Sequence, residues 1–340
     1  MTGWRLTAAK DAGELWRSFP SPAVGSWAGP EKYIADPPLL AAVETALWLG
    51  QPLLVTGEPG CGKTELANYV GWRLDLSRLI EDGQGEPPRY EHALRFDTKT
   101  ETRARDLFYT VDLIERFHAA HSGGPGSAVS PLNFIRFHAL GRAILYARPK
   151  DKLSGRLEKW QAHPGTPRRS VVLIDEIDKA PSDVPNDLLM EIENMRFFIS
   201  ELNLNVSAPA DLRPILIITS NTEKPLPEAF LRRCVYYHIP YPGPERLRQI
   251  VANRIDGLPE DSALLADAVE IFEELRDLQL RKQPATAELL GFVQALREAG
   301  YGLHDRLRVS PGWEGIARAT LLKTKEDQER PLGPLKAAGA

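Results

Sequence analysis

Residues 57 to 64 read Gly-Glu-Pro-Gly-Cys-Gly-Lys-Thr and fit the pattern G-x-x-x-x-G-K-S/T. The glycines permit backbone angles that turn successive N–H groups towards one anion, an arrangement that suits a phosphate. Lys63 can reach the β and γ phosphates of a nucleoside triphosphate, and the Thr64 hydroxyl can ligate Mg²⁺. The stretch therefore predicts a site for ATP and Mg²⁺, with the nucleotide held by Gly57, Glu58, Pro59, Gly60, Cys61, Gly62, Lys63 and Thr64.

The sequence on either side of this loop has the pattern of a strand followed by a helix. The apolar run Pro52 to Thr56 predicts a buried strand before the loop. After the loop, side chains recur at helical spacing, at Leu66, Tyr69, Val70, Arg73 and Leu74. A helix that begins at the loop adds the attraction of its N-terminal dipole for phosphate. This context argues against a chance match in a glycine-rich turn.

The composition indicates an ordinary soluble globular protein. The 340 residues leave room for two or three domains, and 42 basic against 46 acidic residues give a net charge of −4. That charge argues against an overall positive potential that would attract nucleic acid or an acidic membrane. It does not exclude a local basic patch. No apolar stretch has the ~20 residues that cross a bilayer. The two cysteines suit a reducing compartment, so we expect a cytoplasmic protein with no membrane segment.

The order of the apolar segments predicts an α/β core followed by a helical domain. Residues 1–30 are rich in Pro, Gly, Ser and Trp and are interpreted as an irregular arm. Residues 31–240 form the predicted core, with an insertion near 107–140. Beyond the core no strand pattern remains, so 241–300 is predicted to be a domain of three helices. Residues 301–340 are interpreted as a C-terminal extension with a disordered end.

Within the core, helices and strands alternate. Apolar periodicity, uninterrupted apolar runs and Gly or Pro residues set their bounds. The predicted helices are 36–49, 106–120, 185–195 and 227–231. The predicted strands are 52–56, 93–97, 170–174, 215–219 and 235–239. Ser182 or Asp183 is a candidate cap for the helix 185–195.

Two acidic residues follow the strand 170–174. An apolar strand of a parallel sheet delivers Asp175 to the sheet edge, where its carboxylate can bind the solvation shell of Mg²⁺. Glu176 comes next and is suitably placed to polarise a water that attacks the γ-phosphate. The alternative is an acidic strand end with no role, and the presence of the phosphate loop in the same chain argues against it. Asp178 and Glu191 are interpreted as solvated or capping charges rather than metal ligands.

Polar residues also follow the later predicted elements. Asn221 lies just after the strand 215–219, where its amide could hydrogen-bond the γ-phosphate or the attacking water; a turn-forming asparagine is the alternative. Arg232 and Arg233 follow the short helix 227–231. Arginine suits the stabilisation of charge on a phosphoryl group and can be supplied in trans. An arginine pair also occurs as an ordinary surface salt-bridge feature.

Taken in this order, the motifs resemble those of the AAA+ ATPases, and specifically of the MoxR-like branch. The segments that carry the resemblance are Gly57 to Thr64, Val171 to Lys179, Ile218 to Asn221 and Pro227 to Cys234, with Tyr33 to Pro37, Ala104 to Tyr109 and Pro185 to Leu189 as subsidiary matches. The resemblance covers about residues 31 to 300. It implies an α/β P-loop AAA+ core, with a parallel sheet flanked by helices, followed by a small all-helical lid domain.

The resemblance also implies roles for single residues. Asp175 and Glu176 match the second acidic motif, and Asn221 matches the sensor-one polar residue. Arg233, with Arg232 as second choice, matches the arginine finger that reaches a neighbour's ATP. The branch also carries an insertion in the core, which is a candidate for contact with a partner.

Two further positions concern the adenine and the lid. Tyr33 and Ile34 resemble the backbone stretch that cups adenine, although such an apolar pair also fits a core. Many AAA+ proteins place a γ-phosphate-sensing arginine at the position where this chain has Ala287. Arg281 and Lys282 in the preceding loop are interpreted as solvated rather than as replacements.

We therefore expect an ATPase that works as a homo-oligomeric ring, hexameric by resemblance, and remodels a partner protein. MoxR-like proteins resemble chaperones of von Willebrand factor A-domain proteins, so a protein of that kind is the expected partner. A nucleic-acid-directed motor or loader is one alternative, which the net charge opposes. A nucleotide-gated scaffold with little turnover is another, and the intact Glu176 opposes it.

Overall fold

The structure is a computed structural model that describes residues 29–80, 89–122, 130–153, 157, 160, 163–221 and 223–330. The chain divides into two compact units. The α/β unit comprises residues 35–58 and 62–239. The helical unit takes the described residues up to Ile34, Pro59–Cys61 and those from Pro240 on. Most of the arm predicted for 1–30, and the chain end predicted to be disordered, lie outside the described residues.

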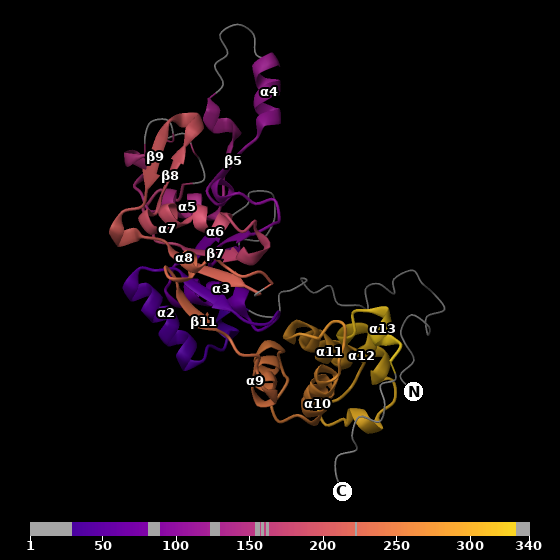
Figure 1. Cartoon of the computed structure of the whole chain (residues 1–340). Helices are drawn as coiled ribbons and strands as arrows, with labels where there is room; N and C mark the ends of the chain where they lie inside the picture. The colour runs from indigo at the N-terminus through magenta and orange to yellow at the C-terminus, as the bar shows by residue number, and fades with distance from the viewer. Residues whose placement is uncertain are drawn as a thin grey trace. The chain divides into compact units, whose positions relative to one another are not determined.

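A parallel sheet of five strands forms the centre of the α/β unit (Figure 1). Its order is β11 (Val235–His238), β1 (Leu53–Thr56), β10 (Ile215–Ser220), β7 (Val171–Asp175) and β4 (Leu94–Asp97). Every residue of β1, β7 and β10 is buried, because these uninterrupted apolar runs are covered on both faces. All five predicted strands are confirmed.

Several of the described helices pack against this sheet. α2 (Pro37–Leu49) contacts β11 and β1, α3 (Lys63–Arg73) contacts β7 and β10, and α5 (Ala139–Tyr146) contacts β4 and β7. The predicted helix 36–49 is confirmed, and Gly50 ends it with φ 62, a left-handed conformation that glycine adopts without penalty. The predicted helix 227–231 is α8 (Glu228–Leu231).

The helix predicted for 106–120 is wrong in its first half. η3 (Ala104–Leu107) leads into β5 (Tyr109–Val111), and α4 (Leu113–Ser122) begins only after that strand. β5 pairs antiparallel with β6 (Ile135–Phe137), and Tyr109 is fully buried with its hydroxyl accepting from the N–H of Ser200 at 3.1 Å. A Tyr-Thr-Val run favours extended backbone, and burial of the aromatic ring outweighs the local helical pattern.

The helix predicted for 185–195 is broken into two short helices. α6 (Val184–Asp187) is followed by α7 (Leu189–Asn194), and the side chain of Asp183 makes no capping hydrogen bond. Met195 then takes a left-handed conformation, φ 43, and starts the turn into β8 (Arg196–Ile199). β8 pairs antiparallel with β9 (Leu204–Ser207), a hairpin that the sequence analysis did not predict. Figure 1 shows α4, β5, β8 and β9 at the end of the α/β unit away from α2 and β11.

Short elements complete the described part of the α/β unit. One further two-stranded pair joins β2 (Arg78–Ile80) to β3 (Arg89–Glu91). The 3-10 helices are η4 (Pro131–Phe134), η5 (Lys150–Lys152), η6 (Ile177–Lys179), η7 (Ser200–Leu202) and η8 (Ala210–Leu212).

The helical unit contains the three predicted helices and two more. Its elements are η2 (Pro30–Lys32), α9 (Pro244–Arg254), α10 (Ala263–Asp277), α11 (Thr286–Glu298), η9 (Leu307–Val309), α12 (Trp313–Leu321) and α13 (Lys325–Gln328). Trp313 and Leu321 of α12 lie in the same buried cluster as Phe272 of α10 and Phe292 of α11. The helical core thus extends past residue 300, into the segment 301–340 that is predicted above as a C-terminal extension.

The close approach of α3 to the chain before β4 leaves no room for a side chain at Gly71. A Cβ added to Gly71 would lie 1.9 Å from the carbonyl oxygen of His92, whereas one added to Gly291 of α11 meets nothing within 4 Å. We expect Gly71→Ala to lower the free energy of unfolding by about 1–3 kcal/mol, because backbone must move to admit the methyl group. Gly291→Ala, the control, should leave it unchanged or raise it by up to ~1 kcal/mol. Urea denaturation followed by circular dichroism measures both, and equal effects would contradict the packing described.

Candidate functional site

Three neighbouring strands of the sheet bring polar residues to one edge. β1, β10 and β7 are adjacent and parallel, so their carboxyl ends meet at the same edge. β1 leads into the loop that begins at Gly57, β7 ends at Asp175, and β10 ends one residue before Asn221. The sheet therefore brings the predicted phosphate loop, the predicted acidic pair and Asn221 together.

The loop has the backbone that a phosphate cradle needs. Gly57, Gly60 and Gly62 have φ of 149, 82 and 92, values that glycine adopts far more readily than other residues. Lys63 is buried at the start of α3, and its ammonium donates to the carbonyl oxygens of Gly57 at 2.7 Å and Glu58 at 2.9 Å. The loop thus folds around a buried cation, as the binding of an anionic phosphate requires.

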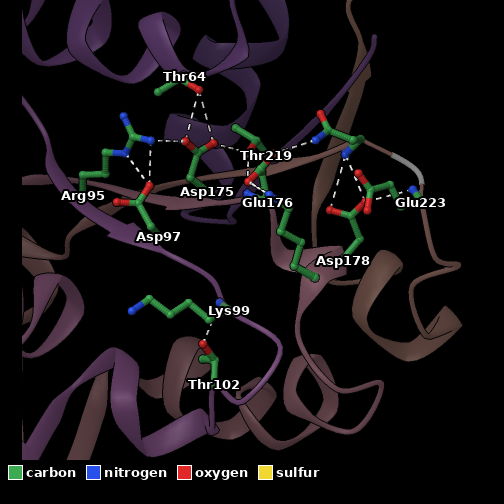
Figure 2. Close-up of polar contacts among 12 residues, drawn as sticks. Thr64, Arg95, Asp97, Lys99, Thr102, Asp175, Glu176, Asp178, Thr219 and Glu223 are labelled. Atoms are coloured by element: carbon green, nitrogen blue, oxygen red, sulfur yellow. Dashed lines mark hydrogen bonds and ion pairs between the residues drawn. The ribbon is translucent and has the colours of Figure 1, made fainter. Parts of the chain in front are cut away.

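The Asp175 carboxylate is the centre of the polar cluster (Figure 2). Its side chain is only 8% exposed. The Thr64 hydroxyl donates to it at 3.2 and 3.3 Å, and the Thr219 hydroxyl donates to Oδ1 at 2.6 Å. A guanidinium nitrogen of Arg95 lies 2.9 Å from Oδ2. The two residues predicted to hold Mg²⁺, Thr64 and Asp175, are therefore in direct contact.

Glu176 and Asn221 form a second contact in the same cluster. The Asn221 amide donates to Oε1 of Glu176 at 2.8 Å, and the Lys179 ammonium donates to Oε2. This bond to Glu176 is the main reason that the pKa of Lys179 is raised. Glu176 itself has a left-handed backbone, φ 55 and ψ 53, and its N–H donates to the Thr219 hydroxyl at 2.8 Å. Such strain costs ~1–3 kcal/mol and is typical of functional sites.

Asp178 fixes the turn that carries Asn221. It is 2% exposed, and its Oδ2 accepts the backbone N–H groups of Asn221 at 3.1 Å and Glu223 at 2.9 Å. Of the two interpretations given to Asp178, the capping charge is confirmed and the solvated charge is wrong. Asp178 thus acts on the site by holding the position of Asn221.

The described residues fit a magnesium ion that is shared with a phosphate ligand. Among these residues no group of three or more His, Cys, Asp and Glu side chains could hold a metal ion. Mg²⁺ is commonly held by one or two protein groups together with phosphate oxygens and waters. The Thr64 hydroxyl and the Asp175 carboxylate, adjacent to the loop, are a donor set of that kind.

Arg233 and Arg232 lie at the other edge of the sheet. α8 precedes β11, and the N–H of Val235 donates to the carbonyl of Pro52 just before β1, so these residues sit at the amino ends of the strands. The Arg233 guanidinium is 3.7 Å from the Glu193 carboxylate, and Arg232 pairs with Glu228. Both arginines are thereby separated from the Asp175 and Glu176 of their own chain.

A cavity of about 410 Å³ adjoins Arg233 at this amino edge. Five apolar side chains line it together with the polar or charged side chains of Gln51, Glu193, Arg213 and Arg233, and with Gly50 and Cys234. Burial raises the pKa of the Cys234 thiol to about 12, so it remains protonated at neutral pH. Cys61 in the phosphate loop and Cys234 form no disulfide.

The remaining predicted residues belong to the helical unit. The carbonyl of Ile34 accepts from the Arg246 guanidinium of α9 at 3.1 Å, so Ile34 and its neighbour Tyr33 are described with that unit. Ala287 is the exposed second residue of α11. Arg281 is 67% exposed and pairs with Glu326 of α13 at 3.4 Å. The backbone N–H of Lys282, like that of Arg281, donates to Asp327.

Three residues of the cluster were not predicted as site residues. Thr219 lies within the strand 215–219, where a buried hydroxyl in an apolar run was the available signal. Lys179 lies one turn after Glu176, at a spacing where a lysine reaches a glutamate. Arg95 lies in the strand 93–97, and nothing in its local sequence indicates contact with a residue 80 positions away.

Comparison with known proteins gives the family. A sequence model of the AAA domain family, dynein-related subfamily, matches residues 52–234, from the residue before β1 to the residue before β11. The protein belongs to this family. The parallel sheet with its phosphate loop is the AAA+ P-loop core, and it is followed by a helical region.

Two solved structures from Thermotoga maritima are similar to the chain. One is the RuvB Holliday junction branch migration motor, at 15% identity and a TM-score of 0.38, and the other is a threonine-to-valine variant of the same RuvB, at 14% identity and the same score. Each match covers 76% of this chain and 59% of the other, so the chain spans about three fifths of their length. No curated protein sequence gave a significant match. Among the described residues no helix has the length and apolar character to cross a membrane.

Proposed function

We propose that the protein is a Mg²⁺-dependent ATPase of the MoxR-like branch, which assembles into a ring and remodels a partner protein. The observation that carries the proposal is the contact between Glu176 and Asn221 beside the pair formed by Thr64 and Asp175. A carboxylate oriented by an amide, next to a phosphate loop, is the arrangement that positions a water for attack on a phosphoryl group.

In this proposal each residue of the cluster has one task. The loop N–H groups and Lys63 hold the phosphates, while Thr64 and Asp175 hold Mg²⁺, which neutralises phosphate charge when bound. The Glu176 carboxylate accepts a proton from the attacking water as the oxygen of that water bonds to the γ-phosphorus and the bond to the β-phosphate oxygen breaks. Asn221 keeps that carboxylate oriented through its bond to Oε1.

The position of Arg233 supports a shared site. Arg233 lies at the amino edge of the sheet, on the far side from the Glu176 of its own chain, and its side chain is 47% exposed. An exposed arginine that cannot serve its own ATP can serve that of a neighbouring subunit. Both arginines have a glutamate partner, Glu228 for Arg232 and Glu193 for Arg233, so the choice of Arg233 as the trans-acting residue follows the family resemblance. We therefore propose a homo-oligomeric ring, hexameric as in the branch that the sequence resembles.

Single substitutions in the full chain test the proposal. Glu176→Gln should retain ATP binding and lose turnover, because the amide cannot take the proton. Arg233→Ala should retain ATP binding and lose ~10³–10⁵-fold in turnover, as for other trans arginines. Arg232→Ala is the matched control and should change turnover little. A phosphate-release assay measures turnover, and a nucleotide-binding assay measures the affinity for ATP. An unchanged single-turnover rate in Glu176→Gln would favour a nucleotide-gated scaffold instead.

The partner proposed is a von Willebrand factor A-domain protein, and the insertion near 107–140 is the proposed docking element. Leu113, Ile114 and Phe117 of α4 are 67%, 74% and 62% exposed, an apolar group that suits protein contact. Affinity purification of the full chain from its source cell should recover such a protein, and Ile114→Ser with Phe117→Ser should lose it. Recovery of nucleic acid, with salt-sensitive stimulation of turnover, would favour the nucleic-acid motor instead.

A further inference from the structure

The pairing of β4 with β7 places two carboxylates opposite each other. In the parallel register Asp97 is the partner of Asp175, and both residues end their strands. Like charges on neighbouring strands repel, and Asp175 is too buried for water to screen it fully. The structure places one cation between them. Arg95 lies two residues before Asp97, so both side chains leave β4 on the same face.

The Arg95 guanidinium bridges the two carboxylates (Figure 2). One terminal nitrogen is 2.6 Å from Oδ1 of Asp97 and 2.9 Å from Oδ2 of Asp175. Nε also donates to Oδ1 of Asp97, at 2.7 Å. Asp97 thus receives two of the three contacts and Asp175 receives one.

This bridge conflicts with the binding of a metal at Asp175. Oδ2 of Asp175 accepts from both Thr64, at 3.2 Å, and Arg95, and Thr64 is the other residue proposed to hold Mg²⁺. Two cations close to one carboxylate repel each other strongly in a partly buried site. Arg95 and Mg²⁺ therefore compete for the same carboxylate.

The surroundings allow the Arg95 guanidinium to leave Asp175 and still keep its contacts with Asp97. The Arg95 side chain is 52% exposed and the Asp97 side chain is 64% exposed, whereas that of Asp175 is 8% exposed. An arginine presents a fork of donors, so it can keep its two bonds to Asp97 when it leaves Asp175. The Arg95–Asp97 pair stays intact, and the charge that Arg95 would leave uncompensated is that of Asp175, which a bound Mg²⁺ would offset.

We propose that Arg95 is a positioning residue that neutralises Asp175 in the nucleotide-free protein and yields this carboxylate to Mg²⁺ when the nucleotide binds, with Asp97 keeping the guanidinium. The inference rests on the proposed function, because it takes Asp175 as a metal-binding group. It adds a residue from β4 to the site and explains why an arginine stands next to a metal-binding carboxylate.

Magnesium titrations of nucleotide binding test the proposal without measuring turnover. The full chain is mixed with a fluorescent, non-hydrolysable ATP analogue, and binding is followed as free Mg²⁺ is raised in a metal buffer. Arg95→Gln removes the competitor, so the half-saturating Mg²⁺ concentration should fall about three- to tenfold. Asp97→Asn leaves Arg95 with Asp175 alone, so that concentration should rise by a similar factor. Arg196→Gln, on the exposed face of β8, is the control and should change nothing.

The double variant separates competition from a simple change of local charge. If Arg95 and Asp97 act only as two charges near the metal, their opposite effects add and the double variant behaves like the wild type. If Asp97 acts through Arg95, Asp97→Asn should not change the half-saturating Mg²⁺ concentration once Arg95 has been removed. The proposal predicts that Arg95→Gln with Asp97→Asn shows the low Mg²⁺ requirement of Arg95→Gln alone. Circular dichroism checks that each variant is folded.

Three results would overturn the inference alone, and a fourth would overturn it together with the proposed function. An unchanged Mg²⁺ requirement in Arg95→Gln, with the analogue still bound, would make the bridge purely structural and leave the proposed function intact. A double variant with the Mg²⁺ requirement of the wild type would likewise overturn the inference and leave the proposed function intact. A roughly tenfold loss of affinity for the analogue at saturating Mg²⁺ would make Arg95 a phosphate ligand instead. If the wild-type chain binds no nucleotide at any Mg²⁺ concentration, the proposed function fails together with the inference.

Discussion

The charge of a buried carboxylate must be offset by hydrogen-bond donors or cations. The Asp175 side chain, at the carboxyl ends of the parallel strands, is only 8% exposed and therefore needs such partners. Its partners come from three different elements: Thr64 of α3, Thr219 of β10 and Arg95 of β4. Each bond fixes the position of an element relative to β7. The Asp175 carboxylate therefore helps to position the phosphate loop, the turn that carries Asn221 and the end of β4.

The parallel arrangement also separates two sets of residues. The carboxyl edge gathers the loop, Asp175, Glu176 and Asn221, while α8 at the amino edge carries Arg233. A connection that returns to the amino edge before β11 cannot bring its side chains to the carboxyl edge of the same sheet. In the proposed ring, one subunit thus supplies the loop and the acids, and the next supplies the arginine. Burial and topology support this division more directly than the arginine pair in the sequence does.

The sequence predicted the parts of the fold that depend on local pattern. Uninterrupted apolar runs predicted β1, β7 and β10, weaker patterns at 93–97 and 235–239 predicted β4 and β11, and Gly50 predicted the end of α2. The antiparallel pairs β5–β6 and β8–β9 were missed because their strands have only three or four residues, too few for a clear pattern of alternation. At Tyr109, burial of an aromatic ring overrode a helical pattern. The loop, Asp175, Glu176 and Asn221 were predictable because fixed spacing encodes them, whereas the bridge from Arg95 to Asp175 depends on a register that only the folded sheet defines.

We propose that each ATP site is completed by a neighbouring subunit, and mixing two inactive variants tests this most directly. Arg233→Ala keeps an intact Glu176, and Glu176→Gln keeps an intact Arg233. If Arg233 acts in trans, rings assembled from an equal mixture contain intact interfaces, about a quarter of the total for random assembly in a cyclic ring. Turnover should then reappear in the mixture at a corresponding fraction of the wild-type rate. A mixture that stays as inactive as either variant alone, although the two assemble together, would contradict a shared site.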